Sequence, residues 1–414
     1  MKILFLSSYY KPEKISSAHF GEDLRGALAA SGHTMELYVP TPTRGVSSEV
    51  RTDYKKNHKI ELEYDGALKV HRFPLFREGK NSLGRAFRYG IQELQHLWFG
   101  LRAKNIDLMP VSSTPPINGL IAILIKKWKK IPYVFTVQDM FPESLVSTGM
   151  TKKGSLLWKI GSWVSNVTYR NASHIIVICD SMKDTLVAKG VPAEKISVVY
   201  NWINTDATVP VSREENPLFD EFGLDRDKFY LTYAGNLGNS QNVSLLVDCA
   251  EQLKGHEDIR FVIFGSGSEK EKLEKRIAES GLANIKLLPL QPVERVSQVY
   301  SLGDASFVLC KKGVGAGAFP SKAASIMATG TPIIASFDLD SDLSRMLETE
   351  NVGIAAEAEN VDAAVAGIRK LYEDRQLCEK MGENARKLAC SRFSKEVGTA
   401  GRIAVFEKYA KANQ

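Results

Sequence analysis

The feature that most constrains the fold is an alternation of short apolar runs with longer amphipathic segments, which continues along most of the chain. Short apolar runs are typical of strands buried on both faces, and amphipathic segments with helical spacing are typical of the helices that cover them. The alternation therefore predicts the α/β class with open, parallel sheets. In the first half, we expect strands at 3–6, 35–39, 68–73, 133–137, 175–178 and 196–199, and helices that include 17–30 and 83–103.

The same rhythm occurs a second time after an interruption. Residues 200–226 contain prolines, asparagines and aspartates without a sustained period, which is typical of a linker. Because 414 residues is long for one domain, we predict two Rossmann-like domains, 1–205 and 206–390, that face each other across a cleft. Ligands in such folds bind at the carboxyl ends of the strands. In the second half, we expect strands at 230–234, 259–264, 285–288, 305–309, 332–335 and 353–356.

The composition is that of an ordinary folded protein. It is 44% hydrophobic and 25% charged, and its net charge of +6 is spread along the chain without a known nucleic-acid-binding motif, so we expect no nucleic-acid partner. The five cysteines are scattered and form no CxxC pair, which favours a reducing, cytoplasmic setting. The longest apolar run, 119–125, is too short to span a bilayer.

The stretch "GVGAGAFPSKAASIMATGTPIIAS" (313–336) predicts a glycine-rich loop, a helix and a strand. Pro320 suits the first helical position, and Gly330 suits the position just beyond the helix. Lys322 would then lie in the first turn, where a cation opposes the helix dipole by about 0.3–1 kcal/mol. This placement becomes favourable if an anion is held there by backbone N–H groups and the ammonium together. The alternative is an ordinary exposed helix start whose lysine extends into solvent.

Two further glycine turns occur in the same half. "YAGNLGNSQ" (233–241) and "FGSGSEKEKL" (264–273) each follow an expected strand and precede an expected helix, which we place near 240–242 for the first. One such turn often serves packing alone, whereas three in one domain favour nucleotide binding. The absence of GxGxxG disfavours a nicotinamide or flavin site.

Polar residues also follow expected strands in the first half. "FTVQDMFPES" (135–144) places Asp139 and Glu143 beyond a buried strand, where either an active-site carboxylate or a first-turn helix acid is expected. His19 follows the first strand, although a lone histidine is more often structural. The sequence contains no G-x-S-x-G elbow, HExxH motif or P-loop, which disfavours metal ligation and nucleophilic hydrolysis.

Three segments mix Lys or Arg with Trp and Phe. This composition suits helices that rest on an anionic membrane surface, and buried aromatics beside solvated lysines explain it equally well. The segments are 83–105, 126–133 and 154–164.

These motifs, in this order, resemble those of retaining GT-B glycosyltransferases of family four, and among them bacterial O-antigen and capsule enzymes similar to fucosamine transferases. The resemblance covers essentially the whole chain. It implies an acceptor-binding first domain, a donor-binding second domain, and a last helix, 391–414, that crosses back to the first. The residues that carry it are "QDMFPES" (138–144), "YAGNLGNSQ" (233–241), "FGSGSEK" (264–270), "LLPLQP" (287–292) and "FPSKAASIMATGTPIIAS" (319–336).

The resemblance also implies roles for individual positions and metal-independent transfer with retained anomeric configuration, with no cofactor besides the nucleotide-sugar substrate. The implied catalytic residues are Asp139, Glu143 and Lys322, and the implied acceptor contacts are Tyr10, His19 and Gln138. The implied donor contacts are Gly235, Asn236, Gly238, Gln241, Gly265, Gly267, Leu288, Lys312, Phe319, Pro320, Ser321, Lys322 and Ser325.

The chain departs from the family pattern at several of these positions. Many relatives carry two glutamates with seven residues between them, the second of which binds the ribose, and the matching positions here are Gly317 and Ser325. The usual Arg and Lys of the first phosphate loop correspond to Asn236 and Gln241, and the usual catalytic His corresponds to Gln138. These departures put the donor's identity and the strength of its binding in question.

We therefore expect a glycosyltransferase that moves an N-acetylated or deoxy sugar from a UDP-sugar to a lipid-linked saccharide during surface polysaccharide assembly. Its expected location is the cytoplasm, at the inner face of the cytoplasmic membrane, with peripheral membrane contact. One alternative is a nucleotide-sugar epimerase of the same architecture, which would form a new sugar without an acceptor. The other is a non-catalytic nucleotide-sugar binding protein, which would bind UDP tightly without transfer.

Overall fold

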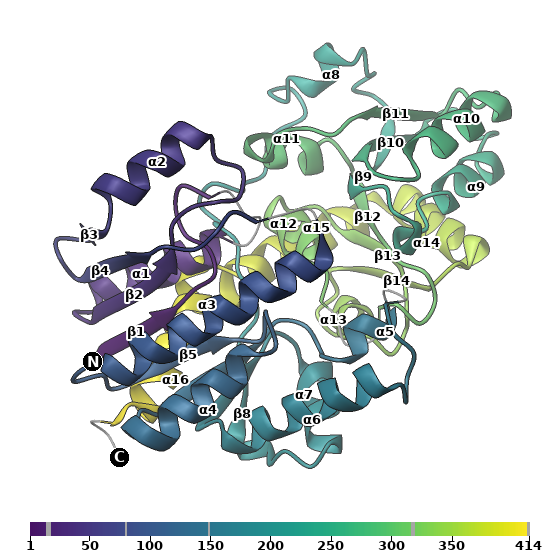
Figure 1. Ribbon diagram of the computed structural model, residues 1–414. Coiled ribbons are helices and arrows are strands. Elements are labelled where there is room, and N and C mark those ends of the chain that lie inside the picture. Colours follow the sequence, from purple (N-terminus) through teal and green to yellow (C-terminus); the bar gives the residue numbers. More distant parts are fainter. Residues whose placement is uncertain (14–17, 79–80, 148–149, 316–318, 412–414) are drawn as a thin grey trace. The chain divides into compact units, whose positions relative to one another are not determined.

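The computed structural model describes residues 1–13, 18–78, 81–147, 150–315 and 319–411, and it is an α/β structure (Figure 1). The chain forms two compact units. The first contains Met1–Val199 and Gly398–Gln414, and the second contains Tyr200–Val397. The C-terminal segment therefore returns to the first unit.

The first unit contains two four-stranded sheets that meet at one edge strand of each. Their strands are β1 (Lys2–Leu6), β2 (Thr34–Pro40), β3 (Ile60–Glu63), β4 (Leu68–Phe73), β5 (Met109–Ser112), β6 (Tyr133–Val137), β7 (His174–Val177) and β8 (Ile196–Val198). One sheet has the order β1-β2-β4-β3 and the other β5-β6-β7-β8. A parallel bridge between Ile3 and Leu108 joins β1 to the segment that leads into β5. Only β3 is antiparallel to its neighbour. The strands before β5 are added on one side of β1 and the later ones on the other side, so the strand order reverses between β1 and β5, as in a Rossmann fold.

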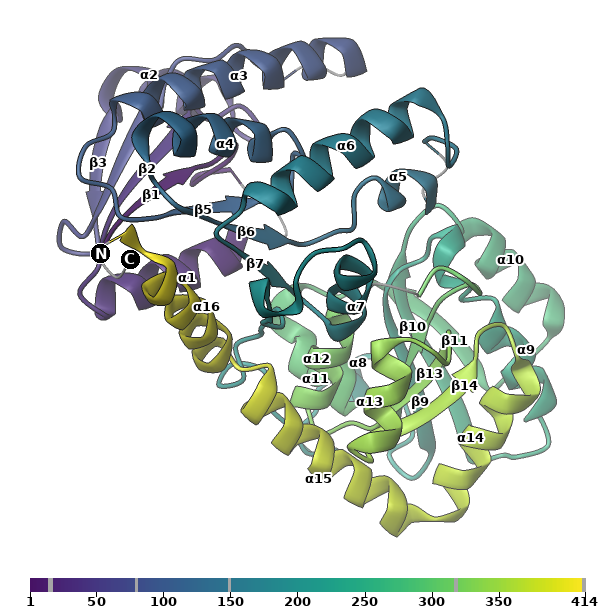
Figure 2. The same ribbon diagram turned by 90° about the horizontal axis from the view of Figure 1, so that it is seen from below.

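Helices cover both faces of this sheet (Figure 2). α3, α4 and α6 lie on one face, and α1 and α16 lie on the other. α16 is fixed to the first unit by the stacking of Tyr409 on His174 and by the contact of Glu407 with His33. The helices of this unit are α1 (Ala18–Ala30), α2 (Ser48–Asn57), α3 (Ser82–Arg102), α4 (Asn118–Lys129), α5 (Glu143–Ser147), α6 (Leu156–Asn171), α7 (Asp180–Ala188), the short η1 (Ala193–Lys195) and α16 (Lys395–Tyr409), which begins in the second unit.

The second unit has one six-stranded parallel sheet in the order β11-β10-β9-β12-β13-β14. Its strands are β9 (Phe229–Asn236), β10 (Ile259–Ser266), β11 (Ile285–Pro289), β12 (Ala305–Leu309), β13 (Ile333–Phe337) and β14 (Gly353–Glu357). Its helices are α8 (Leu218–Glu221), η2 (Asn239–Gln241), α9 (Leu245–Gln252), α10 (Lys270–Ser280), η3 (Val293–Arg295), α11 (Val296–Ser301), α12 (Ser321–Ala328), α13 (Asp342–Thr349), α14 (Val361–Glu373) and α15 (Arg375–Arg392).

Apolar side chains on alternate residues of these strands form two cores, one on each face of the sheet. Along β9, Tyr230 and Ala234 pack with α11, α12 and α13, whereas Leu231 and Tyr233 pack with α9 and α14. Because both faces are covered, most of these strands are largely apolar, which is why the sequence pattern located them.

Short or polar elements are absent from the sequence-based prediction. β5 contains a proline and only four residues, β3 alternates charged residues with exposed apolar ones, and α2 is largely polar and has no buried residue. These segments carry little of the apolar pattern because they bury little apolar surface.

The stretch 200–226 packs onto the second unit instead of forming a loose linker. Asn216 is fully buried and donates a hydrogen bond to the Gln298 carbonyl, and Arg386 of α15 donates to the carbonyls of Thr205 and Thr208. The polar composition of this stretch therefore reflects hydrogen bonding within the unit. Prolines and asparagines in such a pattern do not distinguish a linker from an ordered irregular segment.

Two further observations concern the chain as a whole. The five cysteines form no disulfide bonds. Within the ranges that the structure describes, no helix is long and apolar enough to cross a membrane.

Candidate functional site

The sheet order of the second unit selects one place for a ligand. β9 and β12 are neighbours, and the strands that follow each of them lie on opposite sides: β10 and β11 beside β9, and β13 and β14 beside β12. The loops after β9 and β12 therefore diverge and leave a crevice at the carboxyl ends of these two strands. Both loops belong to motifs singled out in the sequence. The first is 235–241, and the second leads into α12.

The glycines after β9 and β10 allow two loops to pack closely. Gly235 pairs with Gly265 across the two strands. A Cβ on Gly265 would lie 2.5 Å from the side chain of Leu237, and one on Gly267 would lie 2.6 Å from the Leu237 carbonyl oxygen. Gly267 also has φ +156°, which side chains rarely adopt. Gly265 and Gly267 therefore leave space for the buried Leu237, so close packing explains why glycine occupies both positions.

The helices after these two turns differ in how their first N–H groups are used. The first three N–H groups of α9 donate to the carbonyls of Asn242, Val243 and Ser244, and those of Glu269 and Lys270 donate to Leu237 and Gly267. α9 also begins at Leu245, after η2, and not near 240–242 as expected. Of the three predicted anion-binding helix starts, that of α9 is therefore closed by bonds within the unit, whereas in α10 only the N–H of the first helical residue, Lys270, is used in this way.

α12 has an open start, meaning that its first N–H groups lack partners within the helix, and a closed end, meaning that its last carbonyls are hydrogen-bonded. It begins at Ser321, so Pro320 is the N-cap residue instead of the first helical residue, and it provides no side-chain cap. The N–H groups of Ser321 and Lys322 have no partner inside the helix by geometry. At the other end, Gly330 has φ +69°, and Gly330 and Thr331 donate to the carbonyls of Met327 and Ile326. This Schellman motif confirms the predicted role of Gly330.

Lys322 lies at the open start of α12 and extends toward the end of β9. Its ammonium is 4.0 Å from the centre of the Tyr233 ring. A Cβ on Gly235 would lie 3.0 Å from Nζ, so glycine leaves room for the ammonium. No described residue forms an ion pair or hydrogen bond with this ammonium. Burial lowers the pKa of Lys322 to about 8, which shows how little the protein compensates its charge.

Polar groups with unused capacity surround Lys322. Ser321 is exposed and Ser325 is partly buried, and neither hydroxyl has a partner among the described residues. Thr329, which lies four residues after Ser325, is buried and donates to the Ile326 carbonyl, so its hydroxyl is used within α12 and its end. Asn236 donates to Gln241 at 3.3 Å, and a Cβ on Gly238 would lie 2.7 Å from both of these side chains.

Three predicted donor contacts have other partners in the structure. Lys312 forms a 2.7 Å ion pair with Glu357, which raises the pKa of Lys312. Phe319 stacks on Phe393 beneath the start of α12. Leu288 is partly buried against the core of the unit. Gly317, the position matching one family glutamate, lies outside the described residues.

In the first unit, the predicted carboxylates differ in their surroundings. Asp139 follows β6 and is exposed, without a partner among the described residues. Glu143 is the first residue of α5 and pairs with Lys189 at 2.6 Å, so the interpretation as a first-turn helix acid accounts for it. The backbone N–H of Gln138 donates to the Ser113 hydroxyl, which fixes the turn that carries Asp139.

The predicted acceptor contacts Tyr10 and His19 also differ. Tyr10 is buried, donates its hydroxyl to Glu63 at 2.8 Å, and lies against the Arg25 guanidinium, so it is a packing residue and we do not retain it as an acceptor contact. His19 is exposed near the start of α1, beside Phe20.

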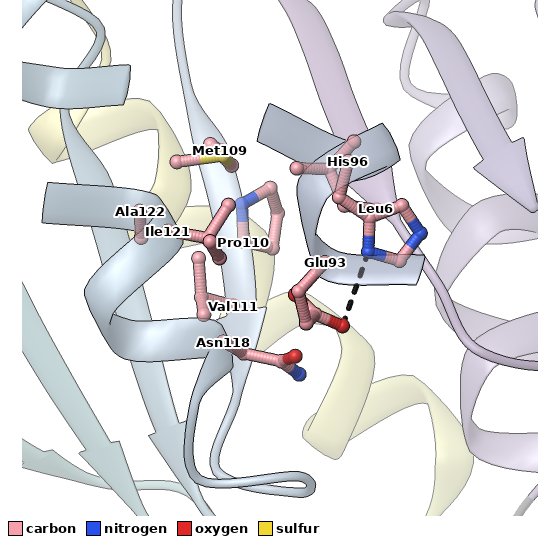
Figure 3. A pocket seen from close by; sticks show the side chains of 9 residues that line it. All are labelled: Leu6, Glu93, His96, Met109, Pro110, Val111, Asn118, Ile121 and Ala122. Atoms are coloured by element: carbon pink, nitrogen blue, oxygen red, sulfur yellow. Dashed lines mark ion pairs between the residues drawn. The ribbon is translucent and has the colours of Figure 1, made fainter. Parts of the chain in front are cut away.

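A buried pair that the sequence did not reveal lies on α3. His96 Nδ1 is 3.4 Å from Glu93 Oε1, and both side chains line a small pocket between α3, α4 and β5 (Figure 3). Their spacing, i and i+3 on one helix, was the available signal, but neither residue belongs to a known motif. Among the described residues, no group of three or more His, Cys, Asp or Glu side chains is arranged to hold a metal ion.

Two family models match the chain in succession. The model described as "Glycosyltransferase Family 4" matches residues 20–207, and the model described as "Glycosyl transferases group 1" matches residues 214–388. The second match includes every element of the crevice between β9, β12 and α12.

Named relatives are similar over most of their length. The chain is 26% identical over 383 residues to a putative colanic acid biosynthesis glycosyl transferase, WcaI, of Escherichia coli, covering 89% of this chain and 92% of WcaI. It is 25% identical over 352 residues to a probable glycosyltransferase, WbjE, of Pseudomonas aeruginosa, covering 85% and 84% of the two chains.

Solved structures with the same fold cover the whole chain. HepE of Anabaena, solved in complex with UDP, has a TM-score of 0.72 at 16% identity and covers 99% of this chain and 100% of its own. Sucrose-phosphate synthase of Thermosynechococcus elongatus has a TM-score of 0.74 at 14% identity and covers 98% of each chain. With two Rossmann-like units in the GT-B arrangement of elements, and a glycosyltransferase model matched in each half, the chain belongs to the family 4 and group 1 glycosyltransferases.

Proposed function

We propose that this glycosyltransferase moves a sugar from a UDP-sugar to a lipid-linked saccharide during surface polysaccharide assembly, with retention of anomeric configuration and without a metal ion. The sugar we propose is N-acetylated or deoxy, and the location is the inner face of the cytoplasmic membrane. The observation that carries the proposal is the unpaired ammonium of Lys322 at the open start of α12. Such a group is stabilised by an anion, and a nucleotide diphosphate supplies one.

The donor's diphosphate would lie between α12 and the loop after β9. Lys322 and the N–H groups of Ser321 and Lys322 would neutralise the charge that develops on the leaving diphosphate. Because this positive potential is fixed before the reaction, no reorganisation is needed as the bond to the sugar breaks. Lys322 would perform the role that a divalent cation has in other transferases, which supports the expected metal independence.

We assign the remaining donor contacts by their position around the proposed diphosphate. Asn236, Gly238 and Gln241 form the loop that faces Lys322 from the end of β9, and Ser325 lies one turn further along α12. We propose that Ser325 binds a ribose hydroxyl, since its own hydroxyl lacks a partner among the described residues. The turns at Gly265–Gly267 and at Leu288 would flank the base.

For the acceptor side, we retain Asp139, Gln138 and His19. Asp139 is the strongest of these because its carboxylate is exposed at the carboxyl end of β6 and has no partner among the described residues. The names of two relatives also support a saccharide acceptor, since one is assigned to colanic acid biosynthesis and a solved structure with this fold, WaaG, is described as involved in lipopolysaccharide biosynthesis.

The donor assignment can be tested by thermal stabilisation. A ligand that binds only the folded protein raises the midpoint of unfolding by mass action, so UDP and UDP-sugars should raise it more than GDP- or TDP-sugars at equal concentration. Stabilisation by GDP or TDP alone would contradict the assignment of uridine.

The role of Lys322 can be tested by turnover. With the donor identified, Lys322→Ala should lose about 2–4 kcal/mol of transition-state stabilisation, or roughly 30- to 1,000-fold in kcat. Lys380→Ala, which removes an exposed lysine of α15 in the same unit, is the matched control and should retain full activity. Unchanged turnover in Lys322→Ala would remove this residue from the mechanism, and NMR of the product's anomeric proton would test retention.

A further inference from the structure

A second cavity, of about 350 Å³, lies in the first unit beside α2. Its volume is at the lower end of the range for small-molecule sites, about 300–1,000 Å³. Four segments contribute to it: the residue after β2, the chain after β4, α2 and α3. The lining residues are Thr41, Arg51, Lys55, Pro74, Leu75, Phe76 and Ile91. None of them belongs to the candidate donor site, which lies in the second unit.

Two basic side chains of α2 face this cavity from successive turns. Arg51 and Lys55 are four residues apart, so they lie on the same side of the helix. One guanidinium nitrogen of Arg51, Nη2, donates to the Leu75 carbonyl at 2.8 Å, whereas the other, Nη1, is buried without a partner. Lys55 is exposed and forms no ion pair with a described residue.

A third basic residue, Arg88, does not line the cavity but contacts a residue that does. Arg88 of α3 is only 1% exposed, and its Nε donates to the carbonyl of Phe76, a lining residue, at 3.1 Å. Its Nη2 donates to the Thr43 hydroxyl at 3.1 Å, while its Nη1 is buried without a partner. An unpartnered guanidinium nitrogen in such a position is costly, unless a ligand or water completes its hydrogen bonding.

The local charge is positive and incompletely balanced. The pKa of Arg51 is lowered by burial and by the nearby Arg77 and Arg88, with Glu13 opposing this effect. One oxygen of Glu13 already accepts the backbone N–H groups of Thr43 and Arg44, at 2.7 and 2.8 Å. The charged groups that act on Arg51 are therefore two arginines and one carboxylate, so the charge beside the cavity is net positive.

We propose that the cavity lined by Arg51 and Lys55 binds a phosphate or diphosphate group of the acceptor substrate. The proposal rests on the transferase function proposed above. Guanidinium forks match phosphate geometry, and a phosphate carries up to two charges and three acceptor oxygens. The phosphate belongs either to a lipid diphosphate that carries the growing saccharide or to a soluble phosphorylated sugar.

The test is calorimetric titration of the full-length protein with inorganic pyrophosphate and with geranyl diphosphate. Pyrophosphate can also occupy the site at Lys322, so all titrations use a Lys322→Ala background. Arg51→Ala and Lys55→Ala should each weaken pyrophosphate binding on the order of tenfold, since each removes a charge-assisted hydrogen bond. Lys56→Ala is the matched control, because Lys56 is the next residue of the same helix and does not line the cavity.

Equal pyrophosphate affinity in Lys55→Ala and Lys56→Ala would overturn the proposal. Because Lys55 is exposed, its substitution should leave the folded structure intact, so the comparison reports on binding. Tighter binding of geranyl diphosphate than of pyrophosphate would assign the phosphate to a lipid, and equal or weaker binding would assign it to a soluble acceptor. Neither result depends on sugar transfer, so a failure of the transferase proposal would be seen separately, in turnover and UDP binding.

Discussion

Lys322 occupies a position that is unfavourable for a lysine in two respects. It lies in the first turn of α12, where the helix dipole repels a cation, and it is packed against Tyr233 without a carboxylate partner among the described residues. The aromatic ring compensates part of this cost. A diphosphate would compensate the rest, since it would attract both the ammonium and the free N–H groups.

This arrangement predicts a dependence of UDP binding on pH. The pKa of Lys322 in the free protein is about 8, and a bound diphosphate must raise it. The contribution of Lys322 to binding is therefore complete below about pH 8 and is lost as the pH rises through the higher pKa of the complex. Titrations at about pH 9 in two buffers of different ionisation enthalpy should show proton uptake on UDP binding. Lys322→Arg, which remains charged, should show none, and uptake that persists in this variant would exclude Lys322 as its source.

A separate prediction concerns the hydroxyl of Ser325 and the recognition of ribose. If Ser325 binds a ribose hydroxyl, UDP should bind more tightly than its 2′,3′-dideoxy analogue by about 0.5–1.5 kcal/mol through this contact. In Ser325→Ala that part of the preference should disappear, whereas the affinity for the dideoxy analogue should be unchanged. An undiminished preference in the variant would show that Ser325 is not the ribose contact.

At the scale of elements, α9 uses its first three N–H groups internally, whereas the N–H groups of Ser321 and Lys322 in α12 have no partner in their own helix. The ammonium of Lys322, packed against Tyr233, further distinguishes the start of α12. The sequence presented all three turns as similar glycine loops. The backbone hydrogen bonds set α9 apart from the other two, and those bonds depend on the conformation of the loop, which the residue pattern does not encode.

α6 has an unusual outward face that bears on membrane contact. Leu156, Leu157, Ile160 and Trp163 are 75%, 51%, 51% and 58% exposed, and Lys152, Lys153 and Lys159 accompany them. α3 and α4 lie on the same face of the sheet as α6 (Figure 2). These two helices also expose Phe87, Leu94, Trp98 and Trp128. Exposed apolar residues mixed with lysines are typical of surfaces that rest on anionic lipid.

The protein should therefore bind vesicles that contain anionic phospholipid. The double substitution Ile160→Ser and Trp163→Ser should weaken this binding on the order of tenfold, because it removes apolar surface that would enter the interface. Leu290→Ser with Val293→Ser removes exposed apolar residues from the second unit and is the matched control. Added salt should also weaken binding. Equal vesicle binding by both double variants would contradict a role for α6.

At the scale of the whole molecule, the α/β class and the twelve expected strands were predictable because most of those strands are rich in buried apolar residues. β3, β5 and α2 were not, since they are short or polar. Lys322 was predictable because the sequence places a lysine in the first turn of an expected helix, where a cation opposes the helix dipole. Arg51 and Arg88 were not, because they are 37 residues apart and only the fold places α2 beside α3.

The central claim is that the second unit binds the donor through Lys322, independently of the basic cavity in the first unit. Calorimetric titration with UDP at neutral pH, on the wild type, Lys322→Ala and Arg51→Ala, tests it most directly. UDP should bind Lys322→Ala on the order of tenfold more weakly or worse than the wild type, because one charge-assisted contact to the diphosphate is lost. Arg51→Ala should bind UDP like the wild type. Wild-type affinity in Lys322→Ala would contradict the account.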